Sequence, residues 1–320
     1  MHRVLALLAT FLFTTEAFLG GGPAWNGLRV TFGNPLTSFN AVPRTVKDAV
    51  ADDFKLISAC GASKNIIGNR YMKDGDEAVI LIFDKNGYIA GIEAGIPSLN
   101  SNPYPYQEIM KYFREESGGY KITAYFVNPG NWHSTCFFNL FKIPSLNSNP
   151  YPYQEIMKYF REESGGYKIT AYFVNPATIC SNGRTEAEFN QQGTGTGLYI
   201  QTGPNPASDY ITIPLKESEV QGTKWTLGKC FYGMGVHYWY NLSEDMSCND
   251  FAPIFLLYNK GKLNAFGWAF QGNYPSTRYE HPSQNTFGLF MKTVPKCLKT
   301  VGTISTLHIY LTRTPALNFC

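Results

Sequence analysis

The sequence predicts a β-rich α+β protein of two homologous tandem halves, each with an antiparallel sheet and a packed helix. Three observations lead to this fold class. One pattern of Gly, Asn-Pro, aromatic and Cys residues occurs twice along the 320-residue chain. Short β-branched runs alternate with turn signals, and a single amphipathic helical segment can be assigned to each half. Sheets with helices on one face are typical of this class.

The repeated pattern extends from Gly27 to Tyr71 and again from Gly197 to Tyr238. Residues 34–56, beginning at Asn34-Pro35, align without a gap on residues 205–227. Identity is low, but aromatic, Gly, Pro and Cys positions keep their order, which favours a divergent duplication. The predicted organisation is a signal peptide at 1–17, a first half at 18–180, a Gly-, Gln-, Thr- and Asn-rich linker at 181–196, and a second half at 197–320.

The amino terminus has the features of a secretory signal peptide. A basic start is followed by the apolar run Val4–Phe13 and then by Thr15-Glu16-Ala17. A transmembrane anchor needs about 20 apolar residues, which this run does not reach. We therefore expect a secreted, extracellular protein without a segment inserted in a membrane.

A second, identical duplication lies inside the first half. Residues 96–129 recur without change as residues 143–176, separated by the spacer 130–142. We interpret the spacer as a translated intron, because codons for Gly130-Asn131 can contain a splice donor and those ending at Lys142 an acceptor. A real insertion and an assembly error are the alternatives. On each interpretation one 47-residue unit, 96–142 or 130–176, is surplus to the fold, and we expect the copy at 143–176 to provide the closing strand.

The seven cysteines predict three disulfides. The spacer contains Cys136, and the other six form an even set, which in a secreted chain indicates disulfides. Equivalence of the halves favours the pairs Cys60–Cys180 and Cys230–Cys320, which leaves Cys248–Cys297 as a bridge special to the second half, although the cysteine count alone allows fifteen pairings.

Individual elements follow from local patterns. The run 78–83 and the segment 88–94 predict a hairpin around Asp84-Lys85-Asn86-Gly87, because Asn-Gly accepts the positive φ of a tight turn. Helical spacing predicts helices over 153–160 and 283–292. Residues 167–174 and 305–311 are then the closing strands of the two halves.

Composition argues against several function classes. Charged residues are 16% of the chain, the net charge is +3, and no Lys/Arg cluster suggests nucleic-acid binding. No nucleophile or zinc-protease motif occurs. The sequence therefore predicts no cofactor and gives no indication of catalysis or of an oligomeric state.

The strongest functional signal is a set of aromatic and histidine residues in the second half. Alternation exposes one face of each strand, and exposed aromatics recognise sugars or apolar ligands. The alternative is core packing. The ligand-binding candidates are His237, Trp239, Trp268, Tyr279, His281, His308 and Tyr310.

These residues predict a secreted, disulfide-bonded protein that binds a carbohydrate or a small apolar ligand. Two alternatives remain: a metal-dependent enzyme that uses His237, His281 and His308 as ligands, and an extracellular matrix protein. The sequon Asn241-Leu242-Ser243 predicts glycosylation of Asn241.

Overall fold

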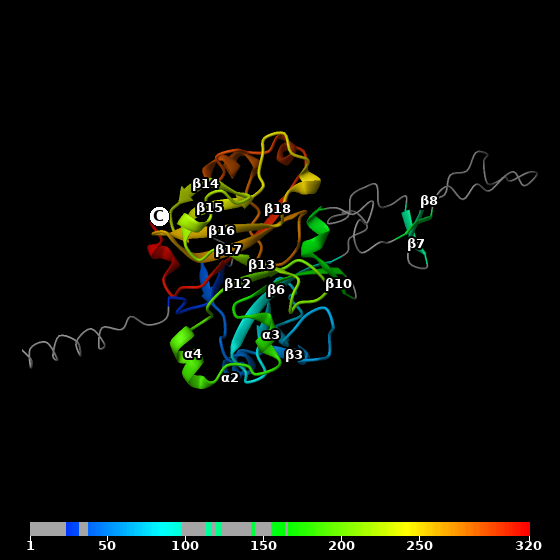
Figure 1. Ribbon diagram of the computed structural model, residues 1–320. Helices are drawn as coiled ribbons and strands as arrows, with labels where there is room; N and C mark the ends of the chain where they lie inside the picture. The colour runs from blue at the N-terminus through cyan, green and yellow to red at the C-terminus, as the bar shows by residue number, and fades with distance from the viewer. Residues whose placement is uncertain are drawn as a thin grey trace, which may run out of the picture.

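The computed structural model describes residues 24–31, 38–97, 113–116, 119–122, 142–144, 155–163 and 166–320 (Figure 1). The expected signal peptide at 1–17, the spacer residue Cys136 and the first Asn-Pro pair, Asn34-Pro35, lie outside these residues. The described chain is β-rich with few helices, and its two large sheets are antiparallel throughout.

The first large sheet, sheet I, has seven strands and is built mainly from the second half of the chain. Apolar, β-branched and aromatic residues dominate these strands, which favours a pleated sheet buried on both faces. In spatial order the strands are β14 (Trp225–Phe231), β15 (Gly235–Tyr240), β16 (Ile254–Asn259), β17 (Lys262–Gln271), β18 (Ile304–Tyr310), β1 (Arg29–Thr31) and β2 (Phe39–Ala41).

The second large sheet, sheet II, is built mainly from the first half. Its spatial order is β13 (Tyr210–Ile213), β12 (Leu198–Gln201), β11 (Gly166–Tyr172), β6 (Ile89–Pro97), β5 (Ile80–Phe83), β4 (Asn69–Met72) and β3 (Lys55–Ser58), and β10 (Arg161–Glu163) also pairs with β11.

The two halves exchange their first two strands. The hairpin β1–β2 begins the chain but completes sheet I through antiparallel pairing of Val30 with Ile309. The hairpin β12–β13 begins the second half but completes sheet II through pairing of Ala171 with Ile200. Each sheet therefore contains strands from both halves, whereas the sequence pattern assigned one sheet to each half.

The two sheets have the same topology. Four consecutive strands, a closing strand and the exchanged hairpin follow one another in each, as β3, β4, β5, β6, β11, β12 and β13 in sheet II and as β14, β15, β16, β17, β18, β1 and β2 in sheet I. Pairing registers also correspond, because Tyr172 lies opposite Gly91 and Tyr310 lies opposite Ala265 at matching points of the two closing strands.

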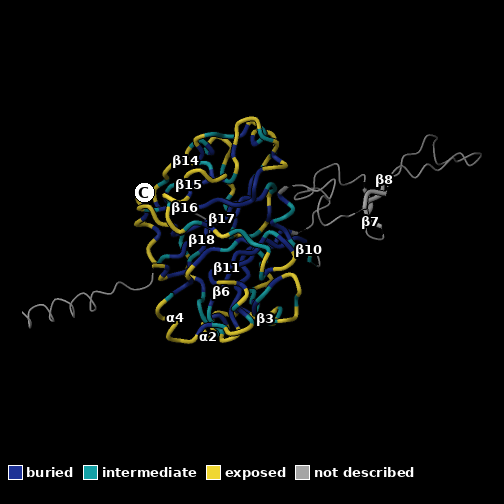
Figure 2. The backbone as a smooth tube through the Cα atoms, viewed as in Figure 1, coloured by how far each residue is buried: buried dark blue, intermediate teal, exposed yellow. Residues whose placement is uncertain are grey.

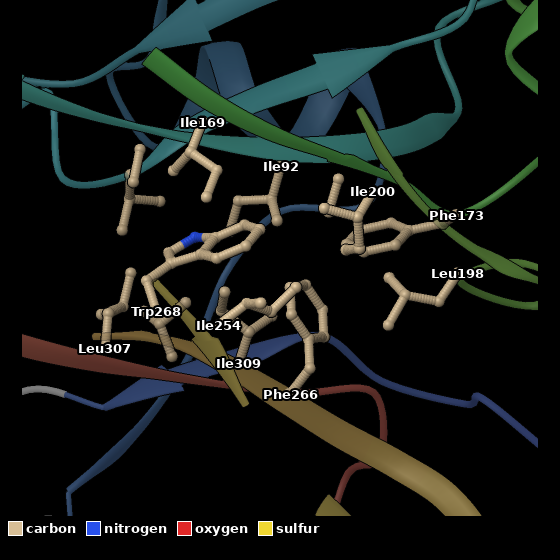
Figure 3. Packing of buried hydrophobic residues seen from close by; sticks show 14 of the residues in the cluster. Ile92, Ile169, Phe173, Leu198, Ile200, Ile254, Phe266, Trp268, Leu307 and Ile309 are labelled. Atoms are coloured by element: carbon tan, nitrogen blue, oxygen red, sulfur yellow. The ribbon is translucent and has the colours of Figure 1, made fainter. Parts of the chain in front are cut away.

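The sheets pack face to face around one shared hydrophobic core. Side chains such as Ile92, Ile169 and Phe173 of the first half meet Phe266 and Trp268 of the second (Figure 3). Phe173 and Phe266 have ring centres 6.2 Å apart. Buried residues accordingly form a layer between the sheets (Figure 2).

The helices are shorter than the sequence pattern predicts. The segment 153–160 forms a 3₁₀ helix, η2 (Glu155–Tyr159), and the segment 283–292 forms another, η5 (Gln284–Leu289). Both predicted helices are therefore present only in part, and they have the i→i+3 bonding of 3₁₀ helices instead of the α-helical spacing that the sequence pattern suggests. The remaining helices are α2 (Val46–Ala51), α3 (Pro176–Ile179), α4 (Glu186–Gln192), η3 (Glu217–Glu219), η4 (Cys248–Asp250), η6 (Lys296–Lys299) and η7 (Pro315–Leu317).

The segment expected to be a linker, 181–196, contains helix α4. Thr185 accepts a hydrogen bond from the N–H of Glu188, and the Glu188 carboxylate accepts one from the N–H of Thr185. This capping box stabilises the first turn of α4. The Thr-x-x-Glu spacing of this capping box is present in the sequence, but the Gly and Asn residues around it led to the prediction of a linker.

The predicted hairpin at residues 84–87 is present between β5 and β6. Asp84 Oδ1 accepts hydrogen bonds from the N–H groups of Asn86 and Tyr88, each at 3.0 Å, and Gly87 has a φ of +88°. A positive φ favours glycine at this position. Local sequence therefore decided this turn.

The identical repeat enters sheet II in two pieces. Strand β6 ends at Pro97, the second residue of the first copy, whereas η2, β10 and β11 come from the second copy. The expectation that the copy at 143–176 completes the sheet at its carboxyl end is confirmed. The first copy forms β7 (Phe113–Glu116) and β8 (Gly119–Ile122). In a separate three-stranded sheet β8 lies in the middle and pairs with β7 on one side and with β9 (Lys142–Pro144) on the other.

The separate sheet reproduces the register of sheet II. Gly119 pairs with Pro144, as Gly166 pairs with Pro97. Arg114 pairs with Lys121, as Arg161 pairs with Lys168. Identical local sequence thus selects identical pairing, but sheet II has one slot for the closing strand.

Deletion of residues 98–144 is expected to stabilise the protein. Because the copies are identical, removing 96–142 or 130–176 gives the same polypeptide. The segment between β6 and η2 shrinks to roughly a sixth of its length, which lowers the loop-closure cost by about 1.5 kcal/mol. Urea unfolding of both chains measures the difference. If the shortened chain unfolds at a lower urea concentration than the full chain, the 47-residue unit is not surplus to the fold.

The three predicted disulfides are all present. Cys60 bonds Cys180, Cys230 bonds Cys320, and Cys248 bonds Cys297. Disulfides are typical of proteins folded in oxidising compartments. Over the part of the chain that is described, no helix has the length and apolar character required to span a membrane.

Candidate functional site

A largely apolar cavity of about 440 Å³ lies on the outer face of sheet I, the face turned away from sheet II. Its walls come from strands β14 to β16 and β18 and from the segment 279–290, which includes η5. Cavities of 300–1,000 Å³ with aromatic walls and a few polar groups are typical of small-molecule sites. The lining includes Phe231, His237, Trp239, Phe255, Glu280, Phe290 and His308.

Five of the seven sequence-predicted ligand residues line this cavity: His237, Trp239, Tyr279, His281 and His308. The other two lie elsewhere. Trp268 is fully buried in the core between the sheets, and Tyr310 stacks beside His308 with ring centres 6.1 Å apart. The structure therefore brings together residues that are more than 70 positions apart in the sequence.

Strand alternation decides which aromatics reach the cavity. On β15, His237 and Trp239 point to the outer face, while Tyr238 points into the shared core. On β17, Trp268 points into the core and its neighbour Gly267 faces outward. A Cβ on Gly267 would lie 2.2 Å from a ring carbon of Phe255, so glycine leaves the space that this ring occupies.

His237 is a buried, neutral imidazole. Its Nδ1 lies 3.2 Å from the carbonyl oxygen of Lys229, so Nδ1 carries the proton and Nε2 keeps a lone pair. Burial and then the nearby His308 lower the pKa of His237 to about 3, although backbone hydrogen bonds oppose this. The ring therefore stays uncharged at neutral pH.

His308 is positioned by a carboxylate. Its Nδ1 lies 2.8 Å from Oε2 of Glu280, and both side chains are 8% exposed. Thr306 donates a hydrogen bond of 3.1 Å to the same carboxylate oxygen. Burial, followed by the charge of Glu280, raises the pKa of the neighbouring Tyr310 well above its usual value.

Some polar atoms beside the cavity have no partner within the described part of the chain. They include the indole N–H of Trp239 and Oε1 of Glu280, both buried. A buried donor or acceptor without a partner costs about 1–3 kcal/mol.

The three histidines do not form a common metal site. His281 is exposed, and its Nε2 lies 3.1 Å from the Ser305 hydroxyl. Among the residues described, no group of three or more His, Cys, Asp or Glu side chains is placed to hold a metal ion. His237 and His308, by contrast, lie close together, with ring centres 6.3 Å apart.

The matching position of sheet II carries charge instead of apolar surface. Arg70 lies opposite Ile82 on β4 and β5, as His237 lies opposite Leu257 on β15 and β16. Arg70 pairs with Glu93 and Glu163. It lines an open, polar hollow of about 570 Å³ together with Glu77 and Lys168. The two outer faces therefore differ in chemistry.

The aromatics that are exposed differ from those expected. Tyr232 and Phe319 are 56% and 55% exposed and contact each other with ring centres 5.3 Å apart, but neither lines the cavity. Asn241 of the sequon is exposed at the end of β15. A glycan there would extend into solvent.

Sequence reasoning missed Phe255, Glu280 and Phe290. Phe255 belongs to a continuous apolar run, which gives no indication of the face it occupies. Glu280 precedes His281 in the sequence but lies near His308 in space, and no sequence signal could have shown that contact.

No protein-family model, curated protein or solved structure matches this chain.

Proposed function

We propose that the protein is a secreted, disulfide-bonded binding protein whose cavity on sheet I takes a small, mainly apolar ligand. The observation that carries this proposal is the aromatic wall around a preformed space of about 440 Å³. Phe290 closes over the imidazole of His237 and the indole of Trp239, with ring centres 5.6 Å and 6.0 Å apart. Such a space suits a compact apolar body.

The arrangement favours an apolar ligand over a carbohydrate. Trp239 and Phe255 are 3% and 1% exposed, so they cannot offer the open platform on which a sugar ring stacks. The exposed pair Tyr232 and Phe319 is the place where a carbohydrate would bind instead.

We also propose that the two halves are homologous. The shared strand order, the corresponding registers and the matching disulfides Cys60–Cys180 and Cys230–Cys320 support a duplication. On this proposal the cavity in sheet I and the charged hollow in sheet II descend from one ancestral site. The copy in sheet I kept room for an apolar ligand.

Ligand binding is tested with a panel of small apolar compounds, such as medium-chain alcohols and alkylbenzenes, beside an oligosaccharide array. We expect apolar compounds to quench tryptophan fluorescence and to raise the unfolding temperature. Replacing Phe290 with alanine should weaken binding by about tenfold to a hundredfold, the worth of one buried aromatic side chain.

The matched control is Tyr232→Ala, which removes an exposed aromatic outside the cavity. This variant should bind apolar compounds as the unaltered protein does. Oligosaccharide binding that is lost in Tyr232→Ala and kept in Phe290→Ala would overturn the proposal in favour of a surface carbohydrate site.

Secretion and glycosylation belong to the same proposal. The three disulfides are compatible with an extracellular protein, and Asn241 is accessible to modification. Expression in a secretory eukaryotic host should give a processed amino terminus near residue 17 in the medium. Peptide N-glycosidase should reduce the mass of the native protein and leave Asn241→Gln unchanged. Retention of the chain in the cytosol would contradict both expectations.

A further inference from the structure

We propose that the two identical copies of the repeat exchange places in sheet II, between the state seen in the structure and a minor state. In the structure, β10–β11 of the second copy fills the slot between β6 and β12. In the minor state, β7–β8 of the first copy fills the same slot. This inference concerns sheet II, so it does not depend on the ligand proposed for the cavity on sheet I.

The first argument is that both copies carry the same side chains into the slot. In the second copy, Glu163 pairs with Arg70, and Ile169 packs between the two sheets (Figure 3). The same positions of the first copy are Glu116 and Ile122. Because residues 96–129 and 143–176 are identical, the ion pairs and core contacts of the slot are equally favourable for either copy.

The second argument is that the first copy already has the required pairing. Within each hairpin the register is the same, β7 with β8 and β10 with β11. Strand β8 also pairs with β9 through Gly119 and Pro144, as β11 pairs with β6 through Gly166 and Pro97. Since β9 contains the same Ile-Pro pair as the end of β6, it provides a partner for whichever hairpin is outside sheet II.

Chain connectivity decides which state is favoured. In the structure the 47 surplus residues lengthen one existing connection, 98–154, between β6 and η2. In the minor state this connection shortens to 98–107, and the surplus residues form a second loop between the closing strand and α3. Loop-closure entropy then favours the state seen in the structure by roughly twentyfold. The first copy therefore occupies the slot in roughly one molecule in twenty.

The exchange leaves the surrounding structure in place. The closing strand β11 ends at Tyr172, and α3 begins at Pro176, so the second loop can leave and return between these two elements. Helix α3 and the bond Cys60–Cys180 are then unchanged. Strand β11 does not line the cavity on sheet I, so the cavity is the same in both states.

The test is a buried charge placed in one copy at a time. Ile169→Asp makes the second copy unfit for the core, so we expect the first copy to replace it. The full chain should remain folded, and urea unfolding should show a folding equilibrium constant lowered only by the roughly twentyfold cost of the second loop. Ile122→Asp is the matched control at the same position of the first copy, and it should not change stability.

Two further variants show that the charge itself is not tolerated. Ile92 lies on β6 in the same core but outside the repeat, so Ile92→Asp has no second copy to replace it and should unfold the protein. The double variant Ile122→Asp/Ile169→Asp should also unfold it. If Ile169→Asp unfolds as Ile92→Asp does, or if the double variant remains folded, exchange of the copies is overturned.

Hydrogen exchange of a milder variant identifies the copy in the sheet. Replacing a core isoleucine with alanine costs at least about thirtyfold in the folding equilibrium, which exceeds the loop preference. Ile169→Ala also gives the two copies peptides of different mass. We expect the peptide that contains Ile122 to be protected and the peptide that contains Ala at position 169 to exchange rapidly. The opposite pattern would overturn the proposal.

Discussion

Replacing Arg70 with alanine is expected to lower the free energy of unfolding by about 3–5 kcal/mol, because it leaves the carboxylate of Glu93 buried without its main counter-charge. The Glu93 side chain has no exposed surface, and the exposed fraction of Arg70 is only 5%. Apart from Arg70, Glu93 accepts one hydrogen bond, from Thr170 at 3.1 Å. Urea unfolding at pH 7 measures the loss.

The loss should also depend on pH. Burial raises the pKa of Glu93, and Arg70 opposes this rise. Without Arg70, the pKa of Glu93 in the folded protein moves further above its pKa in the unfolded chain. The buried charge then lowers the free energy of unfolding by nothing below the unfolded pKa and by an increasing amount as the pH rises toward the folded pKa. The difference between Arg70→Ala and the unaltered protein should therefore be smaller at pH 4 than at pH 8.

A matched control is provided by an exposed ion pair between the residue after β4 and the C-cap of α2. Lys73 lies 2.9 Å from Asp52, but these side chains are 31% and 52% exposed. Lys73→Ala should have no measurable effect, since water screens an exposed pair. If Arg70→Ala and Lys73→Ala unfold at the same urea concentration, Arg70 does not stabilise the fold by compensating the buried charge of Glu93.

Removing the disulfide between Cys60 and Cys180 is expected to cost about 2–5 kcal/mol. The bond joins residues 120 positions apart, so its loss frees a long stretch of the unfolded chain. It also ties the start of the loop after β3 to the end of α3, next to the small cluster of Ile66, Tyr172 and Ile179. The double variant Cys60→Ser/Cys180→Ser, unfolded by heat and by urea, measures the cost.

The comparison is with Cys248→Ser/Cys297→Ser, whose bond spans 49 positions. The chain-entropy account expects this second double variant to lose about 0.8 kcal/mol less. A larger loss at the shorter loop would show that native contacts, and not loop length, set the contribution of these bonds.

Local sequence determined the elements that depend on neighbouring residues. The turn at Asp84–Gly87 follows from an Asn-Gly pair with an aspartate that accepts two backbone N–H groups. The same holds for the hairpin of the identical repeat, which forms in the same register in both copies. Matching cysteine positions predicted the bonds Cys60–Cys180 and Cys230–Cys320, and the two remaining cysteines of the even set predicted Cys248–Cys297.

Tertiary structure decided which face of each strand became the site. Period-two alternation separates Trp239 from Tyr238 and Gly267 from Trp268, but it does not say which set turns toward the other sheet. Five of the seven candidate residues reach one cavity, while Trp268 went to the core between the sheets. The face was fixed only when the two sheets packed together.

Tertiary structure also decided the exchange of β1–β2 and β12–β13 and the contact of Glu280 with His308. A hairpin has the same internal pattern whichever sheet it joins, so its own residues leave the choice of partner open. A carboxylate near a histidine in space need not be near it in sequence. The sequence by itself therefore determined the turns, the disulfides and the strand candidates. The packing of the two sheets determined the cavity, because a cavity is formed by side chains from strands that only the fold brings together.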